Sequence, residues 1–397
     1  MTKLSEDIFL VAALRTPIGK FGGALSSLTA AQLGTESAKA TVARSGVDPD
    51  AIDEVIFGNA RQAGVGPNVA RQIAIKSGLR HEVPAYTVNQ ACGSGLRAIM
   101  NAADQIRLGS AELILAGGTE SMSNTPYLLT RARWGMRMGD GELIDGMVRD
   151  GFLCPLADEM MGSTAETLAD RYKISREEQD QFAVDSQRKA ARAFEEHRFA
   201  EEIVPLKLAG KKGDTTIDRD EHPRSDATVG SMAKLEPVFR KNGTVHAGNS
   251  SGVTDGASSM LVASSRAVEQ HKLQPMARIA GYSQAGVDPK IMGIGPVPAT
   301  RHLLDDLGMS LADIDLVELN EAFAAQVIAC DRELHFERSK LNVHGGAIAL
   351  GHPIGCTGAR IVVTLLHELE RRGARRGLAT LCVSGGMGMA LAIERCV

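Results

Sequence analysis

Cys92 is a candidate nucleophile because of where it lies in the sequence. It stands in VNQACGSGLRAIM, where an apolar strand gives way to glycines and then to a helical pattern. A free thiol with a pKa of about 8.5 is only about 3% thiolate at pH 7, and the N-terminus of a helix lowers that pKa by stabilising the anion. The position therefore predicts an activated thiol, although a small cysteine packed at a strand–helix junction fits the same pattern.

Two histidines in NVHGGAIALGHPIGCTGAR supply a candidate base for this thiol. His344 and His352 stand eight residues apart (352 − 344 = 8) in a segment whose glycines allow sharp bends. A thiol nucleophile needs an adjacent base or a depressed pKa, and either histidine could provide the base. The alternatives are a core histidine or a metal-binding pair. We expect no metal, because no HExxH motif or cluster of carboxylates accompanies them.

Two further side chains stand near strand ends. Cys382, in ATLCVSGGMG, precedes glycines that would expose backbone N–H groups, and a second thiol there could act as an acid or a base. Asn320, in LVELNEAFAAQ, lies between a strand and a helix, where its amide could hold a water or cap the helix. Three other cysteines look structural: Cys154, Cys330 and Cys396. Cys356 lies close to His352 in the sequence and could be catalytic, but we favour a packing role for it.

Short apolar runs bounded by glycine predict the strands that would position these groups. The runs cover residues 8–13, 55–57, 113–116, 316–319, 379–383 and 389–393. Helical spacing of apolar residues lies between several of them. This alternation predicts layers of helices and strands, an α/β fold.

An internal repeat relates the two ends of the chain. GVDPDAIDEVIF from residue 46 resembles GMSLADIDLVEL from residue 308, an offset of 308 − 46 = 262, and the same offset (355 − 93 = 262) aligns Gly93 with Gly355. Two similar halves are therefore expected. The loops that carry Cys92 and His352 should then occupy pseudo-equivalent places at strand ends, where α/β active sites form.

The central part of the chain breaks the rhythm of strands and helices. We predict an inserted domain at 122–246, a first half made of 1–121 plus 247–273, and a second half at 274–397. Within the insertion, Ser175 and Glu178 have the spacing of a capping box at the start of an amphipathic helix.

Composition limits the partners and the compartment. The 397 residues, 44% of them hydrophobic, can bury a large core, and 44 Lys+Arg against 48 Asp+Glu provide no basic field for nucleic acid. No segment is apolar for long enough to span a membrane, and the apolar stretch near residue 8 has the wrong flanks for a secretory signal. Six widely spaced cysteines without CxxC pairs favour neither disulfides nor zinc, so we expect a reducing cytoplasm.

Five blocks in order resemble the thiolase family: VAALRTPIGKFGG at 11–23, NQACGSG at 89–95, NEAFAAQ at 320–326, GHPIGCTGAR at 351–360 and CVSGGMG at 382–388. The resemblance implies a duplicated thiolase fold, a five-layer αβαβα core with an inserted loop domain that covers CoA. It implies reversible Claisen condensation and thiolysis, in which 3-ketoacyl-CoA and CoA give acyl-CoA and acetyl-CoA by ping-pong transfer. CoA and acyl-CoA would be substrates, no cofactor would be covalently bound, and the assembly would be a homodimer or homotetramer.

The resemblance also implies a role for each candidate. Cys92 would accept the acyl group, His352 would activate it, and Cys382 would handle the proton at C2 of the acetyl unit. Asn320 would hold a water that forms an oxyanion hole with His352. A second hole would use the backbone N–H groups of Cys92 and Ser384.

PRSDATVGSMAKLEPVF and HAGNSSGVTDGA resemble the family's CoA-binding segments. The residues implied to line the CoA channel are Arg224, Ser231, Phe239, Ala247, Gly248 and Ser251, with Met161 and Phe323 at the pantetheine or acyl end. Short-chain members commonly have histidine at the position of Met160, and many have glycine at that of Ser384. The rival interpretations are a decarboxylating ketosynthase, which would place histidine or asparagine at Cys382, and a non-catalytic acyl-CoA-binding protein.

Overall fold

The computed structural model describes residues 7–210 and 213–396. Its core is one mixed sheet in the order β14-β15-β16-β13-β1-β12-β5-β3-β4, with β2 paired to β12. The strands of this sheet are β1 (Ile8–Arg15), β2 (Gly19–Lys20), β3 (Glu54–Gly58), β4 (Ala85–Val88), β5 (Leu113–Ser121), β12 (Thr254–Ser264), β13 (Pro275–Gly286), β14 (Leu316–Leu319), β15 (Arg376–Val383) and β16 (Met387–Arg395). The six predicted apolar runs lie in β1, β3, β5, β14, β15 and β16.

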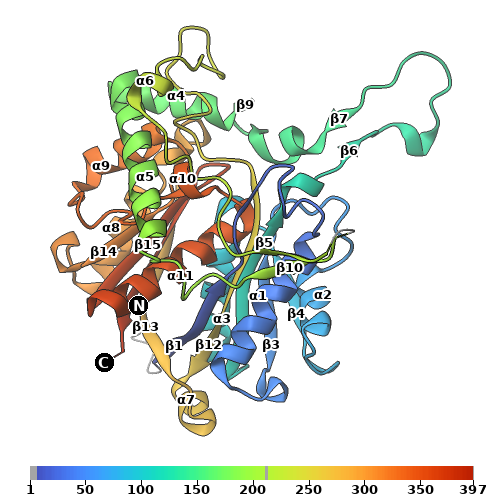
Figure 1. Cartoon of the computed structure of the whole chain (residues 1–397), viewed down its shortest axis with the longest axis vertical. Helices are drawn as coiled ribbons and strands as arrows, with labels where there is room; N and C mark the ends of the chain where they lie inside the picture. Colours follow the sequence, from blue (N-terminus) through green and yellow to red (C-terminus); the bar gives the residue numbers. More distant parts are fainter. Residues whose placement is uncertain (1–6, 211–212, 397) are drawn as a thin grey trace.

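Three of the five layers consist of helices, and strands of the large sheet form the other two (Figure 1). The central layer is α3 (Ser94–Arg107) and α11 (Ile354–Arg372), whose apolar side chains share one core with strands of both halves. One outer layer is α1 (Ala30–Ser45) and α2 (Val69–Lys76), and the other is α8 (Pro296–Leu307) and α9 (Ala324–Leu334). The predicted αβαβα arrangement is confirmed.

The duplication is visible in the sheet. In the first half β3 pairs in parallel with β4 and β5, and in the second half β14 pairs in parallel with β15 while Val317 forms a parallel bridge to Leu341. The short 3-10 turns Pro49–Ala51 and Leu311–Asp313 are related by the same offset, 311 − 49 = 262. The halves join where β1 runs antiparallel to β13, so the loops that precede α3 and α11 come together in the middle of the molecule.

The two central helices touch backbone to backbone. A Cβ at Gly95 would lie 2.7 Å from Ala359 N, and a Cβ at Gly358 would lie 2.4 Å from Leu96 N. No real Cβ approaches another atom so closely, so each helix needs glycine where it crosses the other. This contact brings the N-terminal ends of both helices to one place.

The 122–246 segment covers this place and extends beyond it. In Figure 1 an arm that carries β6 and β7 projects from the body, while α4 and α5 lie against the second half. Ser175 forms the predicted capping box with Glu178. The segment contains β6 (Tyr127–Leu128), β7 (Ile144–Asp145), the π-helical turn η5 (Val148–Phe152), β8 (Leu153–Cys154), β9 (Glu159–Met160), α4 (Met161–Arg171), α5 (Arg176–Glu195), β10 (Leu206–Leu208), β11 (Thr215–Ile217) and α6 (Val229–Met232).

Two further short α-helices are α7 (Ser265–His271) and α10 (Ala347–Leu350), and 3-10 turns lie at Met122–Asn124, Ala132–Trp134 and Pro289–Ile294. Across the described residues, none of the helices has the length and apolar character needed to cross a membrane. The domain boundaries predicted from the sequence remain a prediction.

Candidate active site

Cys92 lies in the turn η2 (Ala91–Gly93), between β4 and α3. Ala91 has φ +45°, a left-handed conformation that is uncommon outside glycine. Hydrogen bonds hold the turn: Asn89 Oδ1 accepts from Ala91 N at 3.0 Å, and Ser94 Oγ accepts from Gln90 N at 2.9 Å. The thiol is therefore carried by a fixed turn at the start of a central helix.

The surroundings of the Cys92 thiol favour its protonated form in the substrate-free site. Burial raises its pKa, against the opposing effects of the Ser384 N–H, which hydrogen-bonds the sulfur, and of the Arg61 charge. The predicted depression of this pKa by the helix N-terminus is wrong for this state, because desolvation outweighs the local helix effect. Cys92 therefore needs a base.

His352, immediately before α11, is arranged as that base. Its backbone N donates to Gly252 O at 3.1 Å, and its Nδ1 lies 2.6 Å from Thr357 Oγ1. The Thr357 hydroxyl donates its one hydrogen to Pro353 O at 3.0 Å, so it accepts from His352 Nδ1–H. This assignment leaves Nε2 without a proton, which is the state a base requires.

Burial and nearby cations keep His352 neutral. Burial, with the charges of Arg360 and Arg61, lowers its pKa to about 3. The other candidate, His344, is a core residue: its Nε2 lies 2.7 Å from Glu368 and its ring meets the Phe199 ring edge-on. Of the two histidines, His352 is therefore the better candidate for the base.

Cys382 is the second thiol of the site. It lies near the end of β15 and is buried, and Cys92 is among the groups that raise its pKa well above the usual value. The strand ends in a tight turn, where Gly385 and Gly386 both have φ +87° and Ser384 presents its N–H to the Cys92 sulfur. The structure therefore brings both thiols and this N–H together.

Asn320 directly follows β14 and is fully buried. Its N–H donates to Thr380 O at 3.0 Å, which places it beside the strand of Cys382. Within the described chain, neither Oδ1 nor Nδ2 has a hydrogen-bond partner. The residue is not a helix cap, because α9 begins at Ala324 with Phe323 at its N-cap position. A buried amide with both ends unpaired suits a bound water.

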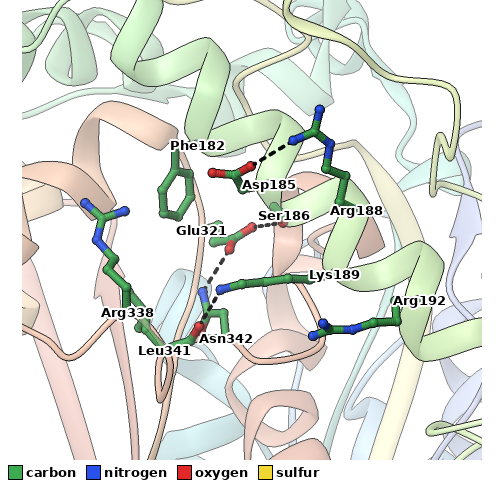
Figure 2. A pocket seen from close by; sticks show the side chains of 10 residues that line it. All are labelled: Phe182, Asp185, Ser186, Arg188, Lys189, Arg192, Glu321, Arg338, Leu341 and Asn342. Atoms are coloured by element: carbon green, nitrogen blue, oxygen red, sulfur yellow. Dashed lines mark hydrogen bonds and ion pairs between the residues drawn. The ribbon is translucent and has the colours of Figure 1, made fainter. Parts of the chain in front are cut away.

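Glu321, the residue after Asn320, is held in place by buried hydrogen bonds. Its carboxylate accepts from Ser186 Oγ at 2.7 Å, Asn342 Nδ2 at 2.9 Å and Ile348 N at 3.2 Å. Figure 2 shows Glu321 between Ser186 of α5 and Asn342, in a hollow that also exposes several cationic side chains. The inserted segment thus fixes the backbone that carries Asn320.

Comparison with models of protein families identifies the family of this chain. Residues 8–266 match the thiolase N-terminal domain and residues 273–395 match the thiolase C-terminal domain. The chain belongs to the thiolase family. It is therefore an acyltransferase that uses coenzyme A thioesters as substrates.

Several known proteins are similar to this thiolase over almost its whole length. An acetyl-CoA acetyltransferase of Syntrophomonas wolfei is 51% identical over 395 residues, covering 98% of this chain and 100% of the relative. One from Pseudomonas aeruginosa is 51% identical over 391 residues, with the same coverage. The crystal structure of human mitochondrial 3-ketoacyl-CoA thiolase superposes with a TM-score of 0.97 at 44% identity, covering 99% of this chain and 100% of that one. A crystal structure of the human enzyme in complex with CoA gives a TM-score of 0.96 at 44% identity, covering 99% of each chain.

The residues expected to contact CoA in this thiolase fall into two neighbouring groups. One lines a hollow beside α6: Arg224, Ser231, Ala247 and Gly248. The other packs around Cys382: Met161, Phe239 and Phe323. The groups adjoin, because Ala324 N donates to Asn249 O at 2.9 Å and Ser251 N donates to Ala322 O at 3.0 Å.

Glu120 is a positioning residue that the sequence reasoning missed. Its buried carboxylate accepts from Asn59 Nδ2 at 2.7 Å, Ala60 N at 3.0 Å, Arg61 N at 3.1 Å and Gly355 N at 2.9 Å. One side chain thus ties the loop after β3 to the first turn of α11, next to His352. In the sequence it stands in AGGTE, a string too generic to draw attention, and Thr357 likewise looks like any residue of a helix.

Proposed function

We propose that this thiolase catalyses reversible thiolysis of 3-ketoacyl-CoA, acetoacetyl-CoA included, to acyl-CoA and acetyl-CoA through an acyl-Cys92 intermediate. One observation carries the proposal: two thiols, a neutral histidine with a free Nε2 and an unpaired amide stand at adjoining strand and helix ends. Thiolysis has two half-reactions, and each transfers one acyl group and moves protons. Each half-reaction therefore needs an acid or base and a group that stabilises the carbonyl oxygen.

In the degradative direction the Cys92 sulfur attacks the 3-keto carbon while His352 Nε2 takes the thiol proton. The bond between C2 and C3 then breaks, and the acetyl-CoA enolate leaves with its C2 protonated by Cys382. The thiol of free CoA gives its proton to the Cys382 thiolate and attacks the acyl-Cys92 thioester. Acyl-CoA leaves, and His352 returns its proton to the Cys92 sulfur. Synthesis uses the same steps in reverse, so substrate concentrations set the direction.

Two groups of donors would stabilise the oxyanions. The Cys92 and Ser384 N–H groups already point at the Cys92 sulfur, where the thioester oxygen would develop charge. A water on Asn320, with the protonated His352, would serve the other carbonyl. Removal of one such donor typically costs roughly a hundredfold to a thousandfold in rate.

The CoA residues, the assembly and the compartment complete the proposal. Arg224, Ser231, Phe239, Ala247, Gly248 and Ser251 would line the CoA channel, with Met161 and Phe323 at its inner end. We also propose a homodimer or homotetramer, because the β6–β7 arm exposes large apolar side chains, Trp134 at 85% and Met138 at 99%. The proposed compartment is the cytoplasm.

Trapping the intermediate tests the proposal. Incubation with acetyl-CoA should add one acetyl group, which peptide mass spectrometry should locate on Cys92. Cys382→Ala should still be acetylated at Cys92 but should not thiolyse acetoacetyl-CoA. Cys396→Ala, which changes a thiol near the chain end, is the matched control. Full thiolysis by Cys92→Ala, or a label on another residue, would refute the assignment.

A further inference from the structure

A buried hydrogen-bond network lies behind the hollow that is expected to take CoA. One side of this hollow, here called the CoA hollow, is formed by Ala247 and Gly248, and another by Ser231, Met232 and Leu235. The two sides are in contact, because a Cβ at Gly248 would lie 2.5 Å from Met232 Sδ and 2.6 Å from Leu235 Cδ1. A shift of either side would therefore change the shape of the CoA hollow.

His246 holds the first side. It is fully buried, whereas Ala247 beside it is exposed. Its Nδ1 accepts from Gly248 N at 3.0 Å, so this nitrogen carries no proton and Nε2 carries it. Nε2–H donates to Asp180 Oδ1 at 2.7 Å, and Asn249 Nδ2 donates to the same oxygen at 3.0 Å. One imidazole thus joins the backbone of Gly248 to a carboxylate on α5.

Asp180 holds the second side through Arg176. Its carboxylate is 2% exposed, and Oδ2 accepts from Arg176 Nε at 2.8 Å. Arg176 Nη2 in turn donates to Met232 O at 2.8 Å and to Leu235 O at 2.9 Å. Burial raises the pKa of Asp180, but the hydrogen bonds from His246 and Arg176 outweigh burial, so the pKa lies below its ordinary value. One ionised carboxylate therefore holds both sides of the CoA hollow.

The described residues that line the CoA hollow include neither His246 nor Asp180, so both act through their neighbours. We propose that His246 and Asp180 are positioning residues for CoA, which keep the two sides of the CoA hollow at a fixed spacing and so strengthen binding of the CoA part of each thioester. This inference rests on the proposed function, because it concerns residues that are proposed to bind CoA. Hydrogen bonds to an ionised carboxylate are roughly twice as strong as neutral ones, which suits them to this task.

A comparison of two acetyl donors tests the proposal. Acetyl-CoA uses the CoA hollow, whereas the acetyl thioester of N-acetylcysteamine lacks the nucleotide and most of the pantetheine arm. We would measure the second-order rate constant for acetylation of Cys92 by each donor, with peptide mass spectrometry, and take the ratio of acetyl-CoA to the short thioester. His246→Leu removes both hydrogen bonds of the imidazole and should lower this ratio by about tenfold, the factor that one hydrogen bond to a charged group typically supplies. Asp180→Asn loses the charge and one of the two acceptor oxygens and should lower the ratio as well.

Two further variants separate the two ends of the imidazole. His246→Asn places an oxygen near the position of Nδ1 and can keep the bond to Gly248. His246→Gln places an amide near the position of Nε2 and can keep the bond to Asp180. Because the link from Gly248 to Asp180 needs both bonds, each of these variants should give a ratio between those of the wild type and His246→Leu.

The ratio is taken within each variant, so a partial loss of folded protein does not change it. His344→Leu is the matched control, because it breaks another buried histidine–carboxylate contact of 2.7 Å, that with Glu368, and should keep the wild-type ratio. A wild-type ratio in either His246→Leu or Asp180→Asn, or an equal fall in His344→Leu, would overturn the inference. Failure of acetyl-CoA to label Cys92 in the wild-type protein would instead refute the proposed function.

Discussion

Thr357→Val tests whether the tautomer of His352 depends on one hydroxyl group. The substitution keeps the shape of a fully buried side chain and removes Oγ1, which accepts from His352 Nδ1–H and donates to Pro353 O. In the variant, Nδ1–H has no acceptor from this side chain. Either that N–H stays unpaired or the proton moves to Nε2, and the base is then in the wrong tautomer.

The expected loss follows from the hydrogen bond. An unpaired buried N–H costs about 1–3 kcal/mol. At about 1.4 kcal/mol for each factor of ten, the rate of Cys92 acetylation should fall about tenfold to hundredfold. The loss should appear mainly in kcat, because Thr357 lies behind His352 and is not among the residues proposed to bind CoA.

Single-turnover acetylation by acetyl-CoA, followed by mass spectrometry, measures the step directly. Thr357→Ser restores a hydroxyl and should recover most of the rate. Thr300→Val is the control for burial, because Thr300 is fully buried and its hydroxyl has no partner in the described structure. Acetylation of Thr357→Val at the wild-type rate would refute the argument that this hydroxyl sets the tautomer.

Three further predictions follow from burial at the site. Iodoacetamide labelling of substrate-free Cys92 should keep rising with pH beyond 8.5, because burial raises its pKa, and a plateau below pH 7 would contradict this. The free energy of unfolding, measured in urea, should fall as the pH falls from 6.5 towards 3. In this range His352 binds a proton in the unfolded chain but not in the native protein, where its pKa is about 3. The variant His352→Gln should therefore show a smaller dependence of this free energy on pH. Gly95→Ala should destabilise the protein by about 1–3 kcal/mol in urea melts, because its methyl group would collide with Ala359 N, and unchanged stability would show that the helices can separate at no cost.

Local patterns sufficed to predict six strands of the large sheet and the candidate residues near strand ends. Each of Cys92, Asn320 and Cys382 is marked by an apolar run that gives way to a polar residue and a bend, and the repeat at offset 262 places the His352 loop opposite the Cys92 loop. These features depend on neighbours in sequence. β12 was missed because TDGASSMLVAS is fully buried although it carries several small polar residues.

The missed residues act through distant contacts. Glu120 meets Gly355, 235 residues away, and Arg61 meets Asp150 on the inserted segment. No spacing rule connects such pairs, and neither glutamate nor arginine is unusual in its own segment. The prediction that the pKa of Cys92 is lowered was wrong for the same reason. The burial that raises this pKa comes from segments distant in the sequence.

Two cysteines can divide the acid and base work because their surroundings differ. Cys92 is partly buried and receives N–H donors on its sulfur, which favour an anion once the substrate arrives and His352 takes the proton. Cys382 is fully buried among Met161, Phe323 and other apolar side chains, and a charge on Cys92 opposes a second charge there. We therefore expect Cys382 to stay protonated while Cys92 reacts, so that an enolate formed beside it would find a proton ready to transfer. The proposed roles of nucleophile and acid thus rest on the environments of the two thiols rather than on the residue type.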